Sequence, residues 1–226
     1  MYEQKKQLLR LLKLFSDNGF SNHLVLIGSW AEYLYMEAGI LPNYEANIRT
    51  LDVDFLVKNL RKPNPPVNIV SLVKEEGFYV EEDCLTGVTR LLNIDGFEVE
   101  FLIAQMGSGD TLALKTNLGI TAQALRHLNL LKSDTININY LGINVTLPTP
   151  EAFVLHKMII NNDRKDKVEK DQAVINGMYK HIDKEKLSIL YEKLTKKEKK
   201  AVDIYFDLII KPMVERNELI DKAKNL

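Results

Sequence analysis

Two aspartates separated by one residue, Asp52 and Asp54, lie in the short segment LDVDFLV. The alternation of acid and hydrophobe predicts a strand, and residues i and i+2 of a strand point to the same face. We therefore expect both carboxylates to project together, with Leu51, Val53 and Phe55 turned to the core. Two carboxylates this close repel each other unless a cation lies between them, and Mg²⁺ prefers such oxygen ligands. The pair indicates either a divalent-metal site or an exposed polar face.

A second acidic strand is predicted further along the chain. The segments GVTRLLNI and FEVEFLIA flank Asp95-Gly96, a dipeptide preferred in two-residue hairpin turns because both positions need a positive φ. The second strand of this hairpin carries Glu98 and Glu100 on one face. We expect Glu100 to be the third carboxylate of the site, because it is central in the strand and followed by apolar residues. Glu98, on the same face, is the alternative.

A glycine-serine turn precedes the aspartate strand. The run HLVLIG indicates a buried strand that ends at Gly28, and SWAEYLYMEAG indicates a helix from Ser29 to Gly39. The first turn of a helix offers backbone N–H groups to anions, and glycine lets a phosphate approach closely. Gly28 and Ser29 are therefore candidate phosphate-binding residues.

The remaining patterns divide the chain into two parts. Helices are expected at 2–18 and about 67–76, and a second hairpin is expected to turn at Leu141-Gly142. After Pro148 only helical patterns follow, with interruptions expected at 161–162, 183, 195 and 212. We predict a mixed α+β domain at 1–147 and an all-helical domain at 148–226.

One acid of the helical part falls in an apolar stripe. Asp171 shares a helix face with Ile175 and Met178 at 3/4 spacing. An acid among apolar side chains costs free energy unless it is paired. We expect Asp171 to face the junction of the two domains and to hold a base there, either Lys157 or Arg164.

Composition excludes several classes of protein. With 226 residues, 46% apolar and 27% charged, the chain has the profile of a folded globular protein rather than a disordered one. The net charge of −1 does not favour nucleic-acid binding by the whole molecule. The single cysteine, Cys84, excludes an internal disulfide and a cysteine-rich metal site. No signal-peptide pattern or membrane-length apolar run occurs, so we expect a cytoplasmic protein without membrane contact.

The order of these motifs resembles that of the nucleotidyltransferases with the polymerase-beta type catalytic fold. Within that superfamily the chain is most similar to the bacterial group that includes the AbiEii-type toxins, through NIRTLDVDFLV at 47–57, LHKMI at 155–159 and RKDKVEKDQAV at 164–174. The resemblance covers most of residues 24–175. It implies an α+β fold, with a mixed β-sheet nucleotidyltransferase core flanked by helices and followed by a C-terminal helical domain.

The resemblance also implies a reaction. A nucleoside monophosphate would pass from a nucleoside triphosphate to an acceptor hydroxyl on an RNA end such as a tRNA, on a protein or on a small molecule. Two Mg²⁺ ions, or Mn²⁺ in their place, would be held by Asp52, Asp54 and Glu100. Gly28 and Ser29 would hold the β- and γ-phosphates.

Three further residues are expected to serve the nucleotide. Arg49 would reach the triphosphate or the acceptor, or else pair with Glu45 on the surface. The resemblance implies a phosphate contact for Lys157, with a solvated helix lysine as the alternative, and Asp171 would hold such a base in place. A toxin with an antitoxin-like partner is the most specific biological reading. The alternative function is a catalytically inactive nucleotide sensor or partner-binding protein on the same fold.

Overall fold

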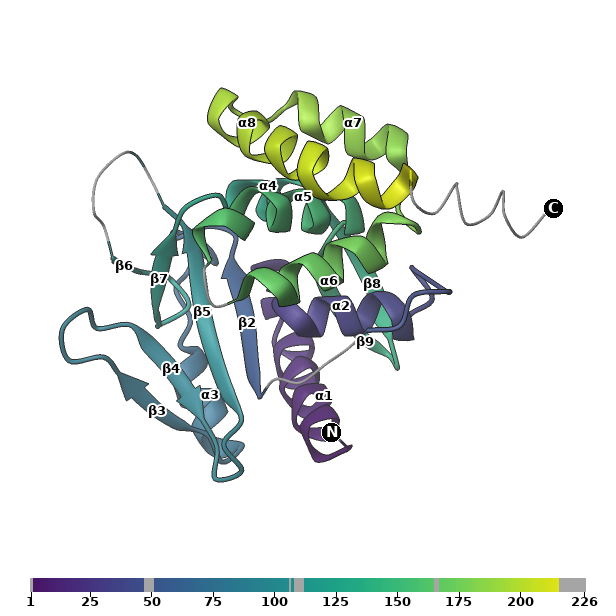
Figure 1. Ribbon diagram of the computed structural model, residues 1–226. Coiled ribbons are helices and arrows are strands. Elements are labelled where there is room, and N and C mark those ends of the chain that lie inside the picture. Colours follow the sequence, from purple (N-terminus) through teal and green to yellow (C-terminus); the bar gives the residue numbers. More distant parts are fainter. Residues whose placement is uncertain (1, 47–50, 106, 108–111, 165–166, 216–226) are drawn as a thin grey trace. The chain divides into compact units, whose positions relative to one another are not determined.

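Two compact units make up the protein, Met1–Thr149 and Pro150–Leu226. The computed structural model describes residues 2–46, 51–105, 107, 112–164 and 167–215 (Figure 1). Among these residues, no helix combines the length and the apolar character needed to cross a membrane.

The first unit combines a mixed sheet, a separate hairpin and several helices. Its helices are α1 (Tyr2–Asp17), the short 3-10 helix η1 (Phe20–Asn22), α2 (Gly28–Glu37), α3 (Ile69–Glu75) and α4 (Asn129–Ser133). Its strands are β1 (Leu24–Ile27), β2 (Asp52–Val57), β3 (Tyr79–Glu82), β4 (Thr89–Leu92), β5 (Glu98–Ala104), β6 (Ala113–Lys115), β7 (Thr121–Leu125), β8 (Thr135–Tyr140) and β9 (Ile143–Pro148).

The sheet has seven strands, in the order β1-β2-β5-β4-β3, with β7 on β5 and β6 on β7 (Figure 1). Strand β2 runs antiparallel to β1 and parallel to β5. Along its other edge, β5 pairs with β4 through its first residues and with β7 through its last ones. This mixed sheet with its helices confirms the expected α+β class.

One face of the sheet is apolar along its length. Val53 and Phe55 of β2 are buried, as expected from the alternation. The ring of Phe55 contacts Phe15 of α1 edge-on at 5.2 Å and stacks with Phe101 of β5 at 6.2 Å between ring centroids. Leu51 is 39% exposed, so its expected core position is wrong: it precedes the first residue of β2, where the strand has not yet begun.

The other face changes character along the strands. Seven buried residues from β1, β2, β5 and the α4 region form an apolar cluster there: Val25, Ile27, Leu56, Leu102, Ala104, Leu128 and Leu131. Asp54 and Glu100 precede Leu56 and Leu102 by two residues, and therefore point to the same face. On this face, the acidic residues of β2 and β5 therefore lie next to the apolar cluster, toward the start of each strand.

The hairpin of β4 and β5 is confirmed, but its turn differs from the expected one. Gly96 has a φ of +75°, whereas Asp95 stays outside the positive-φ region, so the two-residue turn is wrong. The side chain of Asn93 closes a wider connection instead: its Oδ1 accepts from Asp95 N at 3.0 Å and from Phe97 N at 2.9 Å. The Asn93 side chain thus stabilises the turn by accepting backbone hydrogen bonds, and a second residue with a positive φ is not needed.

The hairpin of β8 and β9 turns as predicted. Leu141 and Gly142 have φ values of +52° and +80°, the combination that a two-residue turn requires. The Tyr35 hydroxyl of α2 donates to the Pro148 carbonyl at the end of β9, at 2.8 Å. This buried bond ties the hairpin to the rest of the first unit.

The second unit is helical, as predicted. It contains α5 (Pro150–Ile160), the 3-10 helix η2 (Asn161–Asp163), α6 (Val168–Tyr179), α7 (Lys184–Glu192), α8 (Lys196–Tyr205) and the π-helical turn η4 (Phe206–Ile210). The expected interruptions near 183 and 195 are N-caps: Asp183 caps α7, and Thr195 forms a capping box on α8.

The interruption expected at Pro212 is wrong, because residues 211–215 remain helical. The π-helical turn η4 ends at Ile210, two residues before this proline. Proline lacks an N–H and its ring clashes with the carbonyl four residues earlier. We attribute the widened turn to that clash, which the chain relieves without ending the helix.

Two glycines allow a test of packing in the first unit. Gly119 and Gly77 both have a positive φ, but a Cβ at Gly119 would lie 2.9 Å from the Asn68 backbone, whereas one at Gly77 meets nothing within 4 Å. Both alanine variants pay the left-handed penalty of about 1–2 kcal/mol. We predict that Gly119→Ala loses about 1–3 kcal/mol more than Gly77→Ala in urea unfolding, because the added methyl overpacks the turn. Equal losses would contradict the close approach to Asn68.

Candidate functional site

The parallel register of β2 and β5 brings the predicted acids together. Asp54 lies beside Glu100, and Asp52 lies beside Glu98. Neighbouring strands are about 4.8 Å apart, and paired residues share a face. The four carboxylates therefore form a compact array on one face, two from each strand.

The start of α2 lies against this array. The antiparallel register of β1 pairs Ile27 with Asp54, and the chain turns into α2 at Gly28, where φ is +70°. A Cβ at position 28 would overlap Oδ2 of Asp54. Glycine is therefore required twice, by the backbone conformation and by the neighbouring carboxylate. Asp54 lies at a helix N-terminus, where the aligned peptide dipoles favour negative charge. Ser29 follows in the first turn and is half-buried.

The cation nearest to the glutamates in the described strands is Arg90 of β4, which the sequence analysis did not identify. The antiparallel register sets Arg90 opposite Glu100. Its Nη1 lies 3.3 Å from Glu98 Oε1, and its Nε lies 3.4 Å from Glu100 Oε1. The Arg90 side chain is 44% exposed, so each pair is an exposed one that contributes about 1 kcal/mol at most.

Negative charge dominates this face. Burial raises the pKa of the Glu98 carboxyl, and Arg90 opposes that shift. The charges of Glu100, Asp52 and Glu81 raise the pKa further. The carboxylates of Glu98, Glu100, Asp52 and Glu81 are thus close enough to interact through their charges. Carboxylates this close favour binding of a cation between them.

The donor set suits a divalent ion, but its side chains have not converged on one. Within the described residues, no three His, Cys, Asp or Glu side chains are gathered as a metal-binding group. Arg90 accounts for this, because it engages both glutamates. Rotation of the Glu100 side chain toward Asp54 would break only an exposed ion pair. The residues therefore fit Mg²⁺ or Mn²⁺ after a side-chain movement, with carboxylate oxygens as ligands.

Arg49, Lys157 and Asp171 are the predicted nucleotide-binding residues that do not belong to this array. Arg49 is outside the described residues. Lys157 is on α5 and Asp171 on α6, both in the helical unit. Their contact with a nucleotide stays a prediction, as does the role of the acidic array in metal binding.

The pairing expected for Asp171 is confirmed. This carboxylate is 1% exposed, and its Oδ1 accepts from Lys157 Nζ at 2.6 Å. Arg164 Nη1 lies 3.5 Å from the other oxygen, Oδ2. The hydroxyl of Tyr205 is buried nearby, and its pKa is raised by burial and by the negative charge of Asp171. One acid thus holds two cations inside the helical unit.

Two comparisons with known proteins found similar proteins. A family model described as "Nucleotidyltransferase" matches residues 6–198. An antigenic nucleotidyltransferase-like protein from Paracoccidioides brasiliensis has a similar solved structure, with a TM-score of 0.52 and 14% identity over 95% of this chain and 91% of that one. At this identity the likeness concerns the fold alone. The comparison with curated proteins found no match.

The buried pair of Asp171 and Lys157 gives a stability prediction. Removal of one partner from a buried ion pair costs about 3–5 kcal/mol, because the other charge is left uncompensated. We expect Asp171→Asn to lower the free energy of unfolding by that amount in urea titrations. Asp163→Asn, an exposed change in the same unit, should leave it nearly unchanged.

A double variant tests the cause of that loss. Adding Lys157→Met to Asp171→Asn removes the orphaned ammonium, and it should restore most of the lost stability. A double variant as unstable as Asp171→Asn alone would show that the pair does not act through charge.

Proposed function

The chain belongs to the nucleotidyltransferase family, and from this premise we propose that it transfers a nucleoside monophosphate from a nucleoside triphosphate to an acceptor hydroxyl, in a reaction that requires Mg²⁺. The observation that carries the proposal is the register that sets Asp54 beside Glu100 on β2 and β5, next to the glycine that opens α2. Mn²⁺ would substitute for Mg²⁺, since both accept carboxylate oxygens.

The three acids have distinct tasks in this proposal. Asp52 and Asp54 would hold two divalent ions, and Glu100 would help to hold the ion that serves the acceptor hydroxyl. When bound, the ions supply charge neutralisation at the attacking and leaving oxygens and lower the pKa of the acceptor. Arg90 pairs with Glu98 and Glu100 and offsets part of the repulsion between these carboxylates.

The start of α2 provides the phosphate site of the proposal. Backbone N–H groups of the first helical turn and the Ser29 hydroxyl would donate to the β- and γ-phosphates. The missing side chain at Gly28 lets the Asp54 carboxylate lie against the start of α2, so that a metal held by Asp54 and a phosphate held by α2 would be neighbours. ATP is one triphosphate that would suit this site, because the proposed contacts are with phosphates rather than with a base.

The helical unit and the segment before β2 would add cations. We assign Lys157 to a phosphate, with Asp171 as the positioning residue that fixes its ammonium. Arg49, three residues before Asp52, would reach the triphosphate or the acceptor. Each is a basic group of the kind that neutralises phosphate charge in phosphoryl transfer.

The biological role is a finer part of the proposal. The segments NIRTLDVDFLV, LHKMI and RKDKVEKDQAV resemble the AbiEii-type group, so we assign the chain to a toxin or defence system whose acceptor is a tRNA or a protein. An antitoxin-like partner would restrain it.

Growth measurements test that role. Induced expression of the wild-type chain in a bacterial host should stop growth, and expression of Asp54→Asn at the same level should not. Unimpeded growth with the active wild-type enzyme would exclude the toxin.

A second function draws support from one observation. Glu98 and Glu100 are both engaged by Arg90, and no three acids of the described chain are gathered for a metal. A nucleotide sensor without catalysis would need the phosphate site of α2 but no metal. Such a protein would bind triphosphate and release no pyrophosphate.

Activity measurements separate these two functions. With Mg²⁺, labelled triphosphates and total cellular RNA or protein as acceptors, the wild-type chain should release pyrophosphate. Asp54→Asn and Glu100→Gln should each lower the rate by about a thousandfold, which corresponds to about 4 kcal/mol of transition-state stabilisation.

Two neighbouring acids serve as controls. Glu81→Gln removes a carboxylate of the same face from β3, and should leave the rate within about threefold, a change of less than 1 kcal/mol. Glu98→Gln should do the same if Glu100 is the third ligand. A large loss in Glu98→Gln with little loss in Glu100→Gln would reassign that role. Triphosphate binding without release of pyrophosphate, under every acceptor tested, would favour the sensor.

A further inference from the structure

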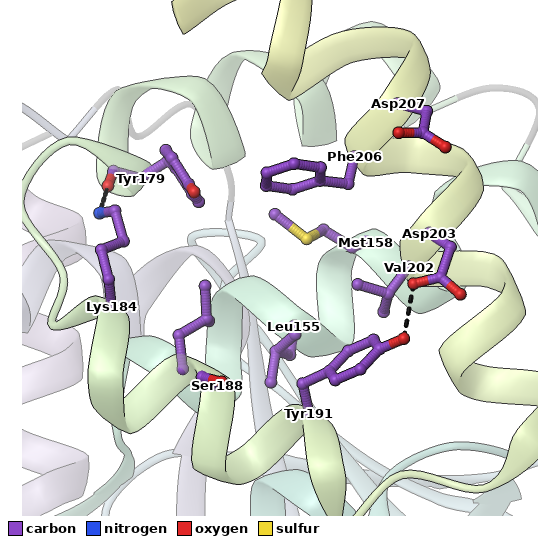
Figure 2. Close-up of a pocket in the computed structure, with 11 residues that line it drawn as sticks. Leu155, Met158, Tyr179, Lys184, Ser188, Tyr191, Val202, Asp203, Phe206 and Asp207 are labelled. Carbon is purple, nitrogen blue, oxygen red and sulfur yellow. Dashed lines mark hydrogen bonds between the residues drawn. The ribbon is translucent and has the colours of Figure 1, made fainter.

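The helical unit contains a pocket that the proposed reaction does not use. Its volume is about 520 Å³ (Figure 2). The lining residues come from α5, α6, α7, α8 and η4, and they include Lys184, the first residue of α7. Pockets of about 300–1,000 Å³ are typical of sites for small molecules. All of its lining residues belong to the second unit.

The walls of the pocket are aromatic and apolar. The rings of Tyr179 and Phe206 meet edge-on, with centroids 6.4 Å apart. Met158 lies close to Phe206 in Figure 2, and Leu155 also lines the pocket. Phe206 is 39% exposed, so part of its ring is accessible beside the flexible thioether of Met158. Such surroundings favour the flat face of another ring.

Two carboxylates and one ammonium group of the described residues line the pocket. Asp203 and Asp207 of α8 and η4 line it and are exposed. Asp203 accepts from the Tyr191 hydroxyl at 2.6 Å, while Asp207 has no ion pair or hydrogen bond among the described residues. The lining cation, Lys184, donates to two backbone carbonyls and lies 4.1 Å above the Tyr179 ring. Among the described residues, the Asp207 carboxylate is therefore open to a ligand, whereas Asp203 and the Lys184 ammonium already have partners.

We propose that this pocket binds a small molecule that joins an aromatic ring to a protonated amine. The ring would lie against Phe206, Tyr179 and Met158, and the amine would meet Asp207 and Asp203. The negative rim disfavours an anionic ligand, and the triphosphate of the transfer reaction is therefore not the occupant. The pocket is a second site, built without the acids of β2 and β5.

Three probes with one ring system separate charge from apolar contact. Tryptamine is cationic, indole is neutral and indole-3-acetate is anionic. Each is titrated into the full chain carrying ¹³C-methyl methionine, with the Met158 signal assigned from Met158→Leu. Tryptamine should shift that signal, indole should do so more weakly, and indole-3-acetate should bind at least tenfold more weakly than tryptamine.

Variants locate the two halves of the ligand. Asp207→Asn should weaken tryptamine about fivefold and leave indole unchanged, because it removes charge from an exposed carboxylate. Glu169→Gln, an exposed change on α6 away from the lining, is the matched control. Ser188→Phe, on the exposed side of α7, should fill the pocket and abolish binding of both probes.

The outcomes are independent of the proposed transfer reaction. Tryptamine should bind the Asp54→Asn variant as it binds the wild-type chain, whatever the effect of that variant on the transfer reaction. Equal affinity for indole-3-acetate would overturn the amine specificity. An unshifted Met158 signal at saturating tryptamine would overturn the small-molecule site, leaving an apolar side chain of a protein partner as the occupant.

Discussion

The parallel pairing of β2 with β5 is the constraint on which the candidate site depends. It alone sets Asp54 beside Glu100, two acids that are far apart in the chain. A shift of one residue in either strand would turn that strand's acids into the apolar core. The core resists such a shift, because Phe55 and Phe101 stack on the opposite face at the next position of both strands. Burial of Phe55 and Phe101 on one face of the sheet thus fixes which side chains of β2 and β5 lie on the other face.

A row of like charges is stable only if its repulsion is offset. Arg90 provides that offset in the structure, and a divalent cation would do so during catalysis. In the proposed reaction a divalent cation would compete with Arg90 for Glu100, so that metal binding and the Arg90 pair would be alternatives for the same carboxylate. The N-terminus of α2 favours the charge of Asp54 in either state, since Gly28 allows the carboxylate to approach the helix closely.

Local patterns in the sequence were enough to predict β2, the β4–β5 hairpin and the buried, paired state of Asp171. Each depends on periodicity within one or two elements. Strands β3, β6 and β7 were missed, because they are short and largely half-exposed, and long-range pairing decides them. Arg90 was missed for the same reason, since its role requires the order of β4 beside β5. The pocket of the helical unit draws on several helices at once, and no single segment indicates it.

Anomalous scattering from Mn²⁺ in crystals of the full chain grown with a non-hydrolysable triphosphate analogue tests the central claim most directly. The account predicts a manganese peak about 2.2 Å from carboxylate oxygens of Asp54 and Glu100, with Glu100 no longer paired with Arg90. Triphosphate bound at α2 without manganese, and with Glu100 still held by Arg90, would contradict a metal-dependent transferase.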